Sequence, residues 1–311
     1  MRRVHSLFIL LLFCASLQAA EDVDAPAEVS EETSMTEEDG GSLVIDRLRR
    51  EREVDDNPSV LLAHKRNYFL PVTYAREPNN EPYQEEFGEE VLDNVEAQFQ
   101  ISLKLPITEG LFTENDAIFG GFTLKAFWQV YNTDLSAPFR ETNYEPEIFW
   151  LTPIPWNPFG GDATLVTVGL SHQSNGRTQL TSRSWNRLYG GIVWERSRYV
   201  YFLKVWYRIP EEEKDDPSDP DGDDNPDIED FMGNFEFTAA WRNYNHEVSV
   251  MLRNNLDLDE NRGAVQIDWT FPLSGRYRGY LQFFNGYGES LIDYDAHIER
   301  VGIGILLTDL L

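Results

Sequence analysis

Two segments, residues 162–174 (DATLVTVGLSHQS) and 183–195 (RSWNRLYGGIVWE), alternate in polarity with a period of two residues. Successive side chains of a β-strand point to opposite faces, so each segment is expected to be a strand. One row of the second segment carries Arg187, Tyr189 and Glu195, while the other row is mainly apolar. A charge that faces lipid at the bilayer centre costs about 2 to 4 kcal/mol, so the charged row must face an interior. The two segments therefore favour a membrane-spanning β-barrel whose apolar rows face lipid.

Twelve segments of this kind follow one another along the chain. They centre approximately on 66–74, 94–105, 117–131, 142–154, 162–174, 183–195, 198–209, 231–242, 245–254, 263–272, 276–287 and 298–311. An even number of antiparallel strands suits a closed bacterial barrel, in which no strand edge is left unpaired. We expect an all-β fold, a twelve-stranded antiparallel transmembrane β-barrel of the outer membrane. A soluble β-sandwich or soluble barrel is the alternative, which the strand number, the turn lengths and an export signal oppose.

The connections between these segments alternate in length. The short ones lie near 155–161, 196–197, 243–244 and 273–275, with 106–116 as an intermediate case, and the long ones near 75–93, 132–141, 210–230 and 288–297. Short turns of such barrels face the periplasm and long loops face the exterior. Both termini are therefore expected in the periplasm, and the loops after Gly176 and Pro210 are expected outside the cell.

Residues 1–20 have the pattern of a secretory signal peptide, with two arginines, an apolar run from Leu7 to Phe13 and small residues before an acidic stretch. Cleavage is expected after Ala20, with a cut after Ser16 as the alternative. The single cysteine, Cys14, then leaves with the signal, so the mature protein is expected to lack disulfides. A lipid-modified Cys14 is the alternative, and the bulky side chain before it disfavours that reading.

The net charge of −28 is concentrated in two windows of the chain. Residues 21–40 hold nine acids and no base, and residues 211–230 hold twelve acids and one lysine. Such a balance disfavours nucleic-acid binding. Residues 21–60 are expected to form an acidic, flexible periplasmic arm, with a helix as one option around 45–52. Residues 61–311 are expected to form the barrel.

Three polar residues, His172, Ser174 and Asn186, lie at the outer end of the lipid-facing rows. Antiparallel partners keep a constant sum of residue numbers, so a hairpin centred near residue 179 pairs His172 with Asn186. Directly opposed side chains have Cβ atoms about 4.5 to 5.5 Å apart. The amide of Asn186 could then hold one imidazole nitrogen while Ser174 meets the other. This pattern predicts the catalytic triad of a serine hydrolase on the outer wall, and a hydrogen-bonded surface cluster is the alternative.

An asparagine carries no negative charge to stabilise the imidazolium, so the triad is expected to need further help with the oxyanion. The candidates are the backbone N–H of Gly176 and a divalent cation held by nearby oxygens. The Gly-x-Ser-x-Gly turn of the α/β-hydrolases is absent. The acidic loop from Asp219 to Asp227 could bind calcium, although Gly222 stands at the wrong position for the helix–loop–helix calcium pattern. A solvated loop is the alternative.

The stretch from His172 to Tyr189 resembles the outer-membrane phospholipase A family of Gram-negative bacteria. Further matching stretches run from Ser136 to Pro146, from Asp224 to Asp227 and from Gly286 to Tyr294. Together they cover the chain from about residue 56 to residue 311. Such long stretches in a fixed order are far more specific than a short motif.

This resemblance implies a calcium-dependent hydrolase with phospholipase A1 and A2 activity, which also acts on lysophospholipids, on a twelve-stranded barrel. Ser174 then corresponds to the nucleophile, His172 to the base and Asn186 to the orienting residue. The family becomes active as a homodimer that binds Ca²⁺ at the subunit interface.

The resemblance also assigns calcium ligands. These are the Arg177 carbonyl and the Ser182 hydroxyl of one subunit, together with Ser136 of the other. A further calcium position of the family, within one subunit, matches Asp224. Its companion acid falls on Gln179 here, so the sequence leaves open whether that second site is kept. A metal site shared between subunits would keep a lone barrel from degrading its own membrane.

A passive barrel that acts as a porin or an adhesin is the competing function. The lumen-facing rows carry bulky and charged residues such as Arg187, Tyr189 and Glu195, which indicates a filled barrel. Wide channels are rare in barrels with so few strands. Hydrolysis of the membrane's own phospholipids is therefore the preferred function.

Overall fold

The computed structural model of the chain describes residues 42–55, 61–84, 92–157, 160–216, 219, 222–274 and 277–309. The predicted signal peptide, Cys14 and the predicted arm up to residue 41 lie outside these ranges. The strands are β1 (Leu62–Ala63), β2 (Asn67–Ala75), β3 (Val95–Glu109), β4 (Ala117–Trp128), β5 (Phe139–Pro153), β6 (Ala163–Ser174), β7 (Ser184–Arg196), β8 (Tyr199–Ile209), β9 (Phe235–Asn243), β10 (His246–Asn254), β11 (Gly263–Pro272), β12 (Arg278–Gly286) and β13 (Ile298–Thr308). The helical elements are α1 (Leu43–Asp55), α3 (Ile228–Met232) and the 3-10 turns η1 (Glu81–Tyr83) and η3 (Gln179–Thr181).

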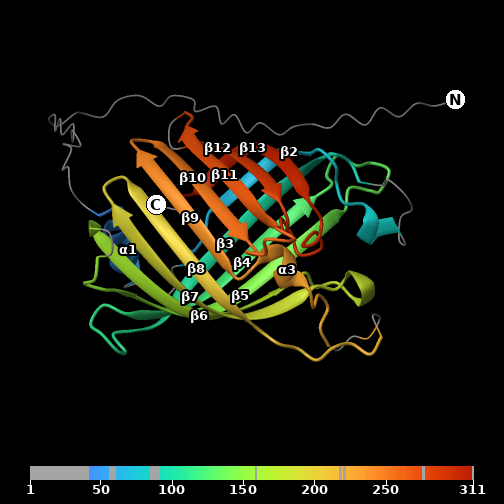
Figure 1. Ribbon diagram of the computed structural model, residues 1–311. Helices are drawn as coiled ribbons and strands as arrows, with labels where there is room; N and C mark the ends of the chain where they lie inside the picture. The colour runs from blue at the N-terminus through green and yellow to red at the C-terminus, as the bar shows by residue number, and fades with distance from the viewer. Residues whose placement is uncertain are drawn as a thin grey trace, which may run out of the picture. The chain divides into compact units, whose positions relative to one another are not determined.

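Strands β2 to β13 form a closed ring (Figure 1). Each pairs antiparallel with its neighbours in sequence, and β13 pairs with β2 to close the barrel. Closure leaves no strand of the ring with an unpaired edge, as a lipid environment requires. The short β1 pairs with β3 alone and is not a member of the ring. The structure thus confirms the predicted twelve-stranded antiparallel barrel.

One expected strand, 231–242, begins later than its sequence pattern indicated. Residues Ile228–Met232 form α3 instead, and the strand β9 starts at Phe235. The helix ends at Gly233, whose φ of 66° lies in the left-handed region that glycine tolerates best. A Cβ at this position would lie 2.1 Å from the carbonyl oxygen of Asn254. The alternating polarity of this stretch predicted a strand, whereas the helix end at Gly233 and the absence of space for a side chain there delay the start of β9.

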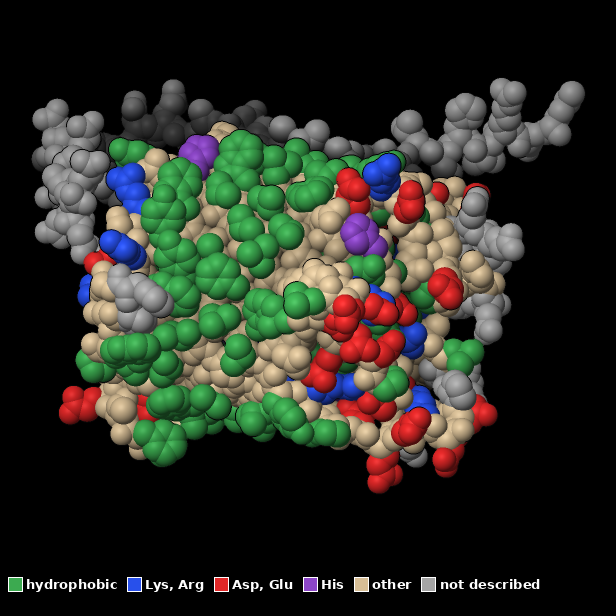
Figure 2. All heavy atoms as spheres, in the orientation of Figure 1, with side chains coloured by type: hydrophobic (Ala, Val, Ile, Leu, Met, Phe, Trp, Pro, Cys, Tyr) green, Lys and Arg blue, Asp and Glu red, His purple; other side chains and the backbone are tan. Residues whose placement is uncertain are grey.

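The two faces of the wall strands are as predicted. The interior row of β7 is buried, with Arg187 6%, Tyr189 4% and Glu195 1% exposed. On the outer rows, Leu170 is 48% and Leu188 is 46% exposed. Figure 2 shows apolar side chains spread over the outer wall, while acidic side chains gather at the end that carries α3. The outer surface therefore suits contact with lipid.

Ion pairs and hydrogen bonds fill much of the interior. The guanidinium of Arg140 lies 3.1 Å from Glu96 and 2.7 Å from Asp293. Arg187 pairs with Glu145 at 2.8 Å. Buried charges need such partners, because an unpaired charge out of water is very costly. A cavity of about 440 Å³ remains inside, lined by charged, aromatic and aliphatic side chains of the wall and of α1.

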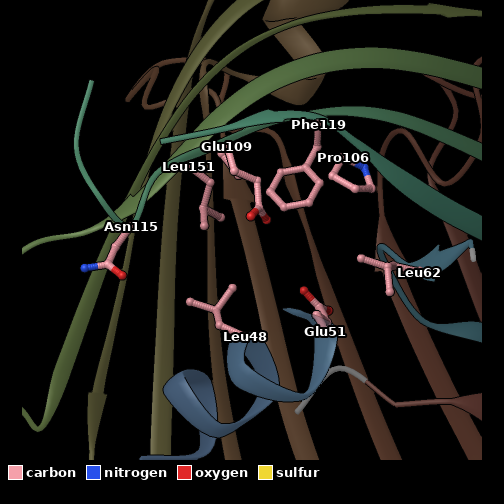
Figure 3. Close-up of a pocket in the computed structure, with 9 residues that line it drawn as sticks. Leu48, Glu51, Leu62, Pro106, Glu109, Asn115, Phe119 and Leu151 are labelled. Atoms are coloured by element: carbon pink, nitrogen blue, oxygen red, sulfur yellow. The ribbon is translucent and has the colours of Figure 1, made fainter. Parts of the chain in front are cut away.

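Helix α1 packs against the inner wall of the barrel. Its apolar residues, Val44 among them, contact Leu165 of β6 and Val200 of β8. Figure 3 shows Leu48 and Glu51 of α1 across a small cavity from wall residues of β4 and β5. Of the helices in the described ranges, none is long and apolar enough to cross a bilayer. The predicted arm, 21–60, thus contains an ordered helix where the sequence had offered one.

Glu195 of β7 holds the first turn of α1. Its carboxylate accepts hydrogen bonds from the backbone N–H of Leu43 at 2.7 Å and of Val44 at 3.1 Å, and from the Ser42 hydroxyl at 2.5 Å. The Ser42 hydroxyl oxygen in turn accepts from the N–H of Ile45 at 3.1 Å. The first N–H groups of a helix have no partners within the helix, and a carboxylate also favours the positive end of its dipole.

The connections fall into two sets that alternate along the chain and therefore lie at opposite ends of the barrel. The first set comprises 110–116, 154–162, 197–198, 244–245 and 273–277, and the second comprises 76–94, 129–138, 175–183, 210–234, 255–262 and 287–297. The shortest turns belong to the first set and the longest loops to the second, as predicted. The connection 154–162 is as long as 175–183, so length alone would not assign that turn.

We expect Glu195→Gln to loosen α1 from the wall. Charge-assisted hydrogen bonds contribute about 1.5 to 3 kcal/mol, so protection of the first-turn amides of α1 from hydrogen exchange should fall roughly 10- to 100-fold. Glu114→Gln is the matched control, because it removes the same charge from an exposed position on the turn between β3 and β4. Equal protection in the wild type and in Glu195→Gln would contradict the role of this carboxylate.

Candidate active site

His172 and Asn186 face each other across β6 and β7, as the residue sum predicted. They are direct partners in the ladder, and Nδ1 of His172 lies 2.9 Å from Oδ1 of Asn186. An amide oxygen only accepts, so Nδ1 must carry the hydrogen. The other ring nitrogen, Nε2, then has a free lone pair and can accept a proton. Both residues lie in the outer rows of their strands, next to the exposed Leu170 and Leu188.

Ser174 lies two residues beyond His172 on the same face of β6. It is the partner of Ser184 in β7 and of Tyr144 in β5, and it is half-buried. In the described part of the chain, no hydrogen bond joins the Ser174 hydroxyl to His172. Residues two apart in a strand are separated by roughly 6.6 Å along its axis, so side-chain rotation has to close the remaining gap. Catalytic hydrogen bonds are often long before substrate binds.

Asn175 organises the loop that follows Ser174, and sequence reasoning did not single it out. It is 5% exposed. Its Oδ1 accepts from the backbone N–H of Arg177 at 3.2 Å and of Arg183 at 3.0 Å, while its Nδ2 donates to the Thr181 carbonyl at 2.9 Å. An asparagine that directly precedes a glycine is a common turn signal, which could have identified it.

Gly176 follows with a left-handed backbone. Its φ is 66°, and a Cβ there would lie 3.3 Å from the ring of Tyr144. No other described residue accepts a hydrogen bond from its backbone N–H. The group therefore remains available beside the candidate nucleophile.

Two of the candidate calcium ligands come together in the structure. The hydroxyl of Ser182 donates to Oδ2 of Asp224 at 2.7 Å, which links the β6–β7 loop to the β8–β9 connection. Ser184 adds a contact of 3.4 Å to the same oxygen. The ammonium of Lys214 lies 2.6 Å from Oδ1 of Asp224, and both side chains are about nine-tenths buried. Hydroxyl and carboxylate oxygens thus cluster here, and the ammonium group of Lys214 is paired with the carboxylate.

The other two candidate ligands are the Arg177 carbonyl, in the same β6–β7 loop as Ser182, and Ser136 in a different connection. The Arg177 side chain binds Glu141 at 3.1 Å and lies over the ring of Tyr83. Ser136 is exposed in the β4–β5 connection with a φ of 60°. No contact among the described residues joins Ser136 to Ser182 or Asp224. Three or more His, Cys, Asp or Glu side chains do not gather anywhere in the described ranges in a way that could hold a metal.

Glu211 also contacts the candidate triad, and the sequence did not point to it individually. Its Oε1 accepts a hydrogen bond of 2.9 Å from Nδ2 of Asn186. Ile209, the last residue of β8, is the ladder partner of Asn186. Two residues further along, Glu211 continues on the same face. Extending the alternation of β8 past Pro210 places Glu211 on the same face as Ile209, and this signal could have identified it.

The interior side of the same hairpin is closely packed. Trp185 is fully buried, and its indole N–H donates to Oε1 of Gln173 at 2.9 Å. The guanidinium of Arg187 stacks 4.1 Å from the Trp185 ring. Packing beneath the strands thus holds the backbone that carries the outward-facing polar residues.

The chain is similar to known proteins over most of its length. Residues 44–307 match the phospholipase A1 family. Phospholipase A1 of Proteus vulgaris is 34% identical over 87% of this chain and 88% of its own length, and that of Klebsiella pneumoniae is 33% identical over 82% and 85%. A relative from Neisseria meningitidis serogroup B is 37% identical over 258 residues, but this chain spans only 65% of its length.

Solved structures agree with these sequence relatives. Outer membrane phospholipase A from Escherichia coli matches with a TM-score of 0.74 at 34% identity, over 82% of this chain and 95% of that one. An outer membrane phospholipase dimer of Salmonella typhi with bound calcium matches with a TM-score of 0.75 at 33% identity, over 84% and 97%. A further structure of the Escherichia coli protein is an active-site mutant with an asparagine replaced by alanine. The chain is therefore an outer-membrane β-barrel enzyme that belongs to the phospholipase A1 family.

Proposed function

We propose that this enzyme hydrolyses the acyl esters of phospholipids and lysophospholipids in the outer leaflet, with phospholipase A1 and A2 activity. Ser174 is the nucleophile, His172 the base and Asn186 the residue that orients the base. The observation that carries this proposal is the 2.9 Å contact between His172 Nδ1 and Asn186 Oδ1 on the outer wall, in the same row as Ser174. The asparagine named in the active-site mutant of the Escherichia coli relative supports the assignment.

The residues account for each proton in the reaction. As Ser174 Oγ attacks the ester carbonyl carbon, its proton passes to Nε2 of His172. The C–O bond to the glycerol oxygen then breaks, and the imidazolium returns the proton to that oxygen. In the second round water attacks the acyl-serine carbonyl and its proton passes to His172. The bond between the acyl carbon and Ser174 Oγ then breaks, His172 returns the proton to Oγ, and the fatty acid is released.

The position of the site supports a membrane lipid as the substrate. Leu170 and Leu188 flank His172 and Asn186 on the outer wall and are about half exposed. Acyl chains lying along such a wall would keep their apolar contacts while the ester group reaches the polar end of the strands. The long loops border this end, and in outer-membrane barrels they face the cell exterior.

The oxyanion needs donors or positive charge that the triad does not supply. The Gly176 N–H is one donor, because no other described residue accepts from it and it lies just beyond Ser174 in sequence. Ca²⁺ bound nearby would add positive charge that stabilises the developing oxyanion. The calcium-bound dimer of the Salmonella typhi relative supports a role for this ion.

The donor set fits calcium in part. Hydroxyl, carbonyl and carboxylate oxygens are the ligands that Ca²⁺ prefers, and Ser182 and Asp224 lie 2.7 Å apart. We assign Ser182, the Arg177 carbonyl and the partner's equivalent of Ser136 to a site at the subunit interface, and Asp224 to a position within one subunit. The ammonium of Lys214 competes for Asp224, since it lies 2.6 Å from Oδ1.

Homodimerisation follows from this ligand assignment. Ser136 lies on the β4–β5 connection and contacts neither Ser182 nor Asp224 within the described part of its own chain. The exposed apolar outer wall, with Leu170 and Leu188, offers a surface for a second barrel in the membrane. A lone barrel beside its substrate would then lack a complete metal site and remain inactive.

A passive porin is less well supported by the interior. Paired charges such as Arg140 with Glu96 and Arg187 with Glu145 occupy the lumen, and α1 packs against its wall. Calcium-dependent release of fatty acid, without ion conductance, separates the enzyme from the porin.

We expect Ser174→Ala to abolish the release of fatty acid from phosphatidylethanolamine in mixed micelles with calcium. Asn186→Ala should lower kcat by about 10- to 100-fold, because the imidazole loses its orienting acceptor. Ser171→Ala is the matched control, since it lies on the same strand but faces the interior. Hydrolysis by Ser174→Ala at the wild-type rate would refute the triad.

Asp224→Asn and Lys214→Met should change the calcium requirement in opposite directions. The first removes a charged oxygen ligand and should raise the calcium concentration for half-maximal hydrolysis by about tenfold. The second removes the competing ammonium and should lower it. Asp215→Asn, an exposed charge on the same connection, should leave the requirement unchanged. If both Asp224→Asn and Lys214→Met titrate as the wild type does, Asp224 is no calcium ligand.

Mixing two inactive variants tests the shared site. Ser136→Ala lacks the ligand given to the partner, and Ser174→Ala lacks the nucleophile, so each dimer alone should be inactive. A mixed dimer joins an intact Ser174 with an intact Ser136 of the other subunit. Activity should therefore return on mixing. About half of the dimers would be mixed and each would have one complete site, so the activity should reach roughly a quarter of the wild-type value or less. A fully active Ser136→Ala monomer, isolated after crosslinking, would exclude a site completed by the partner.

A further inference from the structure

Glu211 lies behind the candidate triad, on the side of Asn186 away from His172. The Asn186 amide makes two hydrogen bonds in opposite senses, each 2.9 Å long. Its oxygen accepts from Nδ1 of His172, and its nitrogen donates to Oε1 of Glu211. Ser174, His172, Asn186 and Glu211 therefore form a row of polar side chains that ends on a carboxylate.

The fold fixes where this carboxylate lies. Ile209, which ends β8, is the ladder partner of Asn186, and Pro210 limits the backbone that follows. Glu211 is half-buried, whereas the adjacent Glu212 and Glu213 are exposed. Of these three consecutive acids, only Glu211 has a side-chain hydrogen bond to the triad in the described structure.

We propose that Glu211 is a positioning residue for the hydrolytic reaction and acts through Asn186. This inference rests on the proposed function, in which His172 is the base. The two orientations of an asparagine amide have nearly the same shape, so neighbours must decide which one is adopted. A flipped Asn186 would place its oxygen against the Glu211 carboxylate and its NH₂ group against the hydrogen on Nδ1 of His172. Glu211 excludes that orientation.

Glu211 also supplies negative charge that the amide lacks. Hydrogen bonds to ionised groups are roughly twice as strong as neutral ones, and chains of hydrogen bonds polarise one another. The carboxylate draws the amide proton and so leaves the Asn186 oxygen more negative. The imidazolium that forms while Ser174 attacks is then stabilised through the amide.

Single substitutions separate orientation from charge. Glu211→Gln keeps an oxygen that can accept from Asn186 but removes the charge, and we expect kcat to fall about threefold. Glu211→Ala removes both and should lower kcat by about tenfold. KM should stay unchanged for both, because Glu211 does not contact the lipid. Glu213→Gln, which removes the same charge from an exposed neighbour, should match the wild type. Wild-type kcat in Glu211→Ala would overturn the proposal.

Double substitutions test whether Glu211 acts through Asn186. In an Asn186→Ala background, Glu211→Ala should cause no further loss of kcat, since the intermediary is already absent. In an Asn186→Asp background two carboxylates would face each other, so Glu211→Gln should raise kcat there. A merely structural loop contact would give the same loss in every background, and that result would overturn the proposal.

The outcomes distinguish this inference from the proposed function. If the wild type releases fatty acid and Ser174→Ala does not, the triad stands whatever Glu211 does. If Ser174→Ala hydrolyses as fast as the wild type, the proposed function itself fails. If Ser174→Ala is inactive while Glu211→Ala equals the wild type, only the positioning role of Glu211 is wrong.

Discussion

The register between β6 and β7 is the constraint on which the site depends. A slip of one residue would turn His172 and Ser174 toward the lumen, because successive side chains of a strand face opposite ways. The two rows of β7 prevent this slip. Arg187 and Glu195 find their ionic and helix-capping partners only inside, and Leu188 belongs against lipid. The alternation that makes the barrel stable in a membrane therefore also fixes the outward position of His172.

The sequence predicts contacts within a short hairpin better than contacts made by a long loop. His172 pairs with Asn186 as expected, because the residue numbers of antiparallel partners in a short hairpin have a constant sum. The existence of the strands was also predictable. The start of β9 was not, because alternating polarity does not reveal the helix end at Gly233 or its close approach to Asn254. The contact of Ser182 with Asp224 arises from the path of a long loop. No periodicity constrains such a path, so the sequence gives candidates there but no contacts.

The acidic β8–β9 connection has a more definite structure than a solvated loop. It contacts the β6–β7 hairpin through Glu211 on Asn186, through Asp224 on Ser182 and through Asn225 on Ser184. Asp223 anchors it to the wall by an ion pair of 2.5 Å with Arg208. Asp227 accepts a hydrogen bond of 2.6 Å from Tyr294 in the β12–β13 connection. The high charge of this segment is therefore partly used to join the long loops around the site.

The placement of Glu211 also gives a physical reason why the third member of the proposed triad can be an uncharged amide. Asn186 lies in an outer row beside Leu188, where a carboxylate would have to be desolvated against lipid. An amide avoids most of that cost but stabilises an imidazolium poorly. The charge lies instead beside the neighbouring strand, on Glu211 two residues past the end of β8, where the acidic connection begins and the surroundings are polar. The amide then transmits its effect to His172 across two hydrogen bonds of 2.9 Å. The proposed site thus gains a carboxylate at the polar end of the outer face, beyond the last residue of β8.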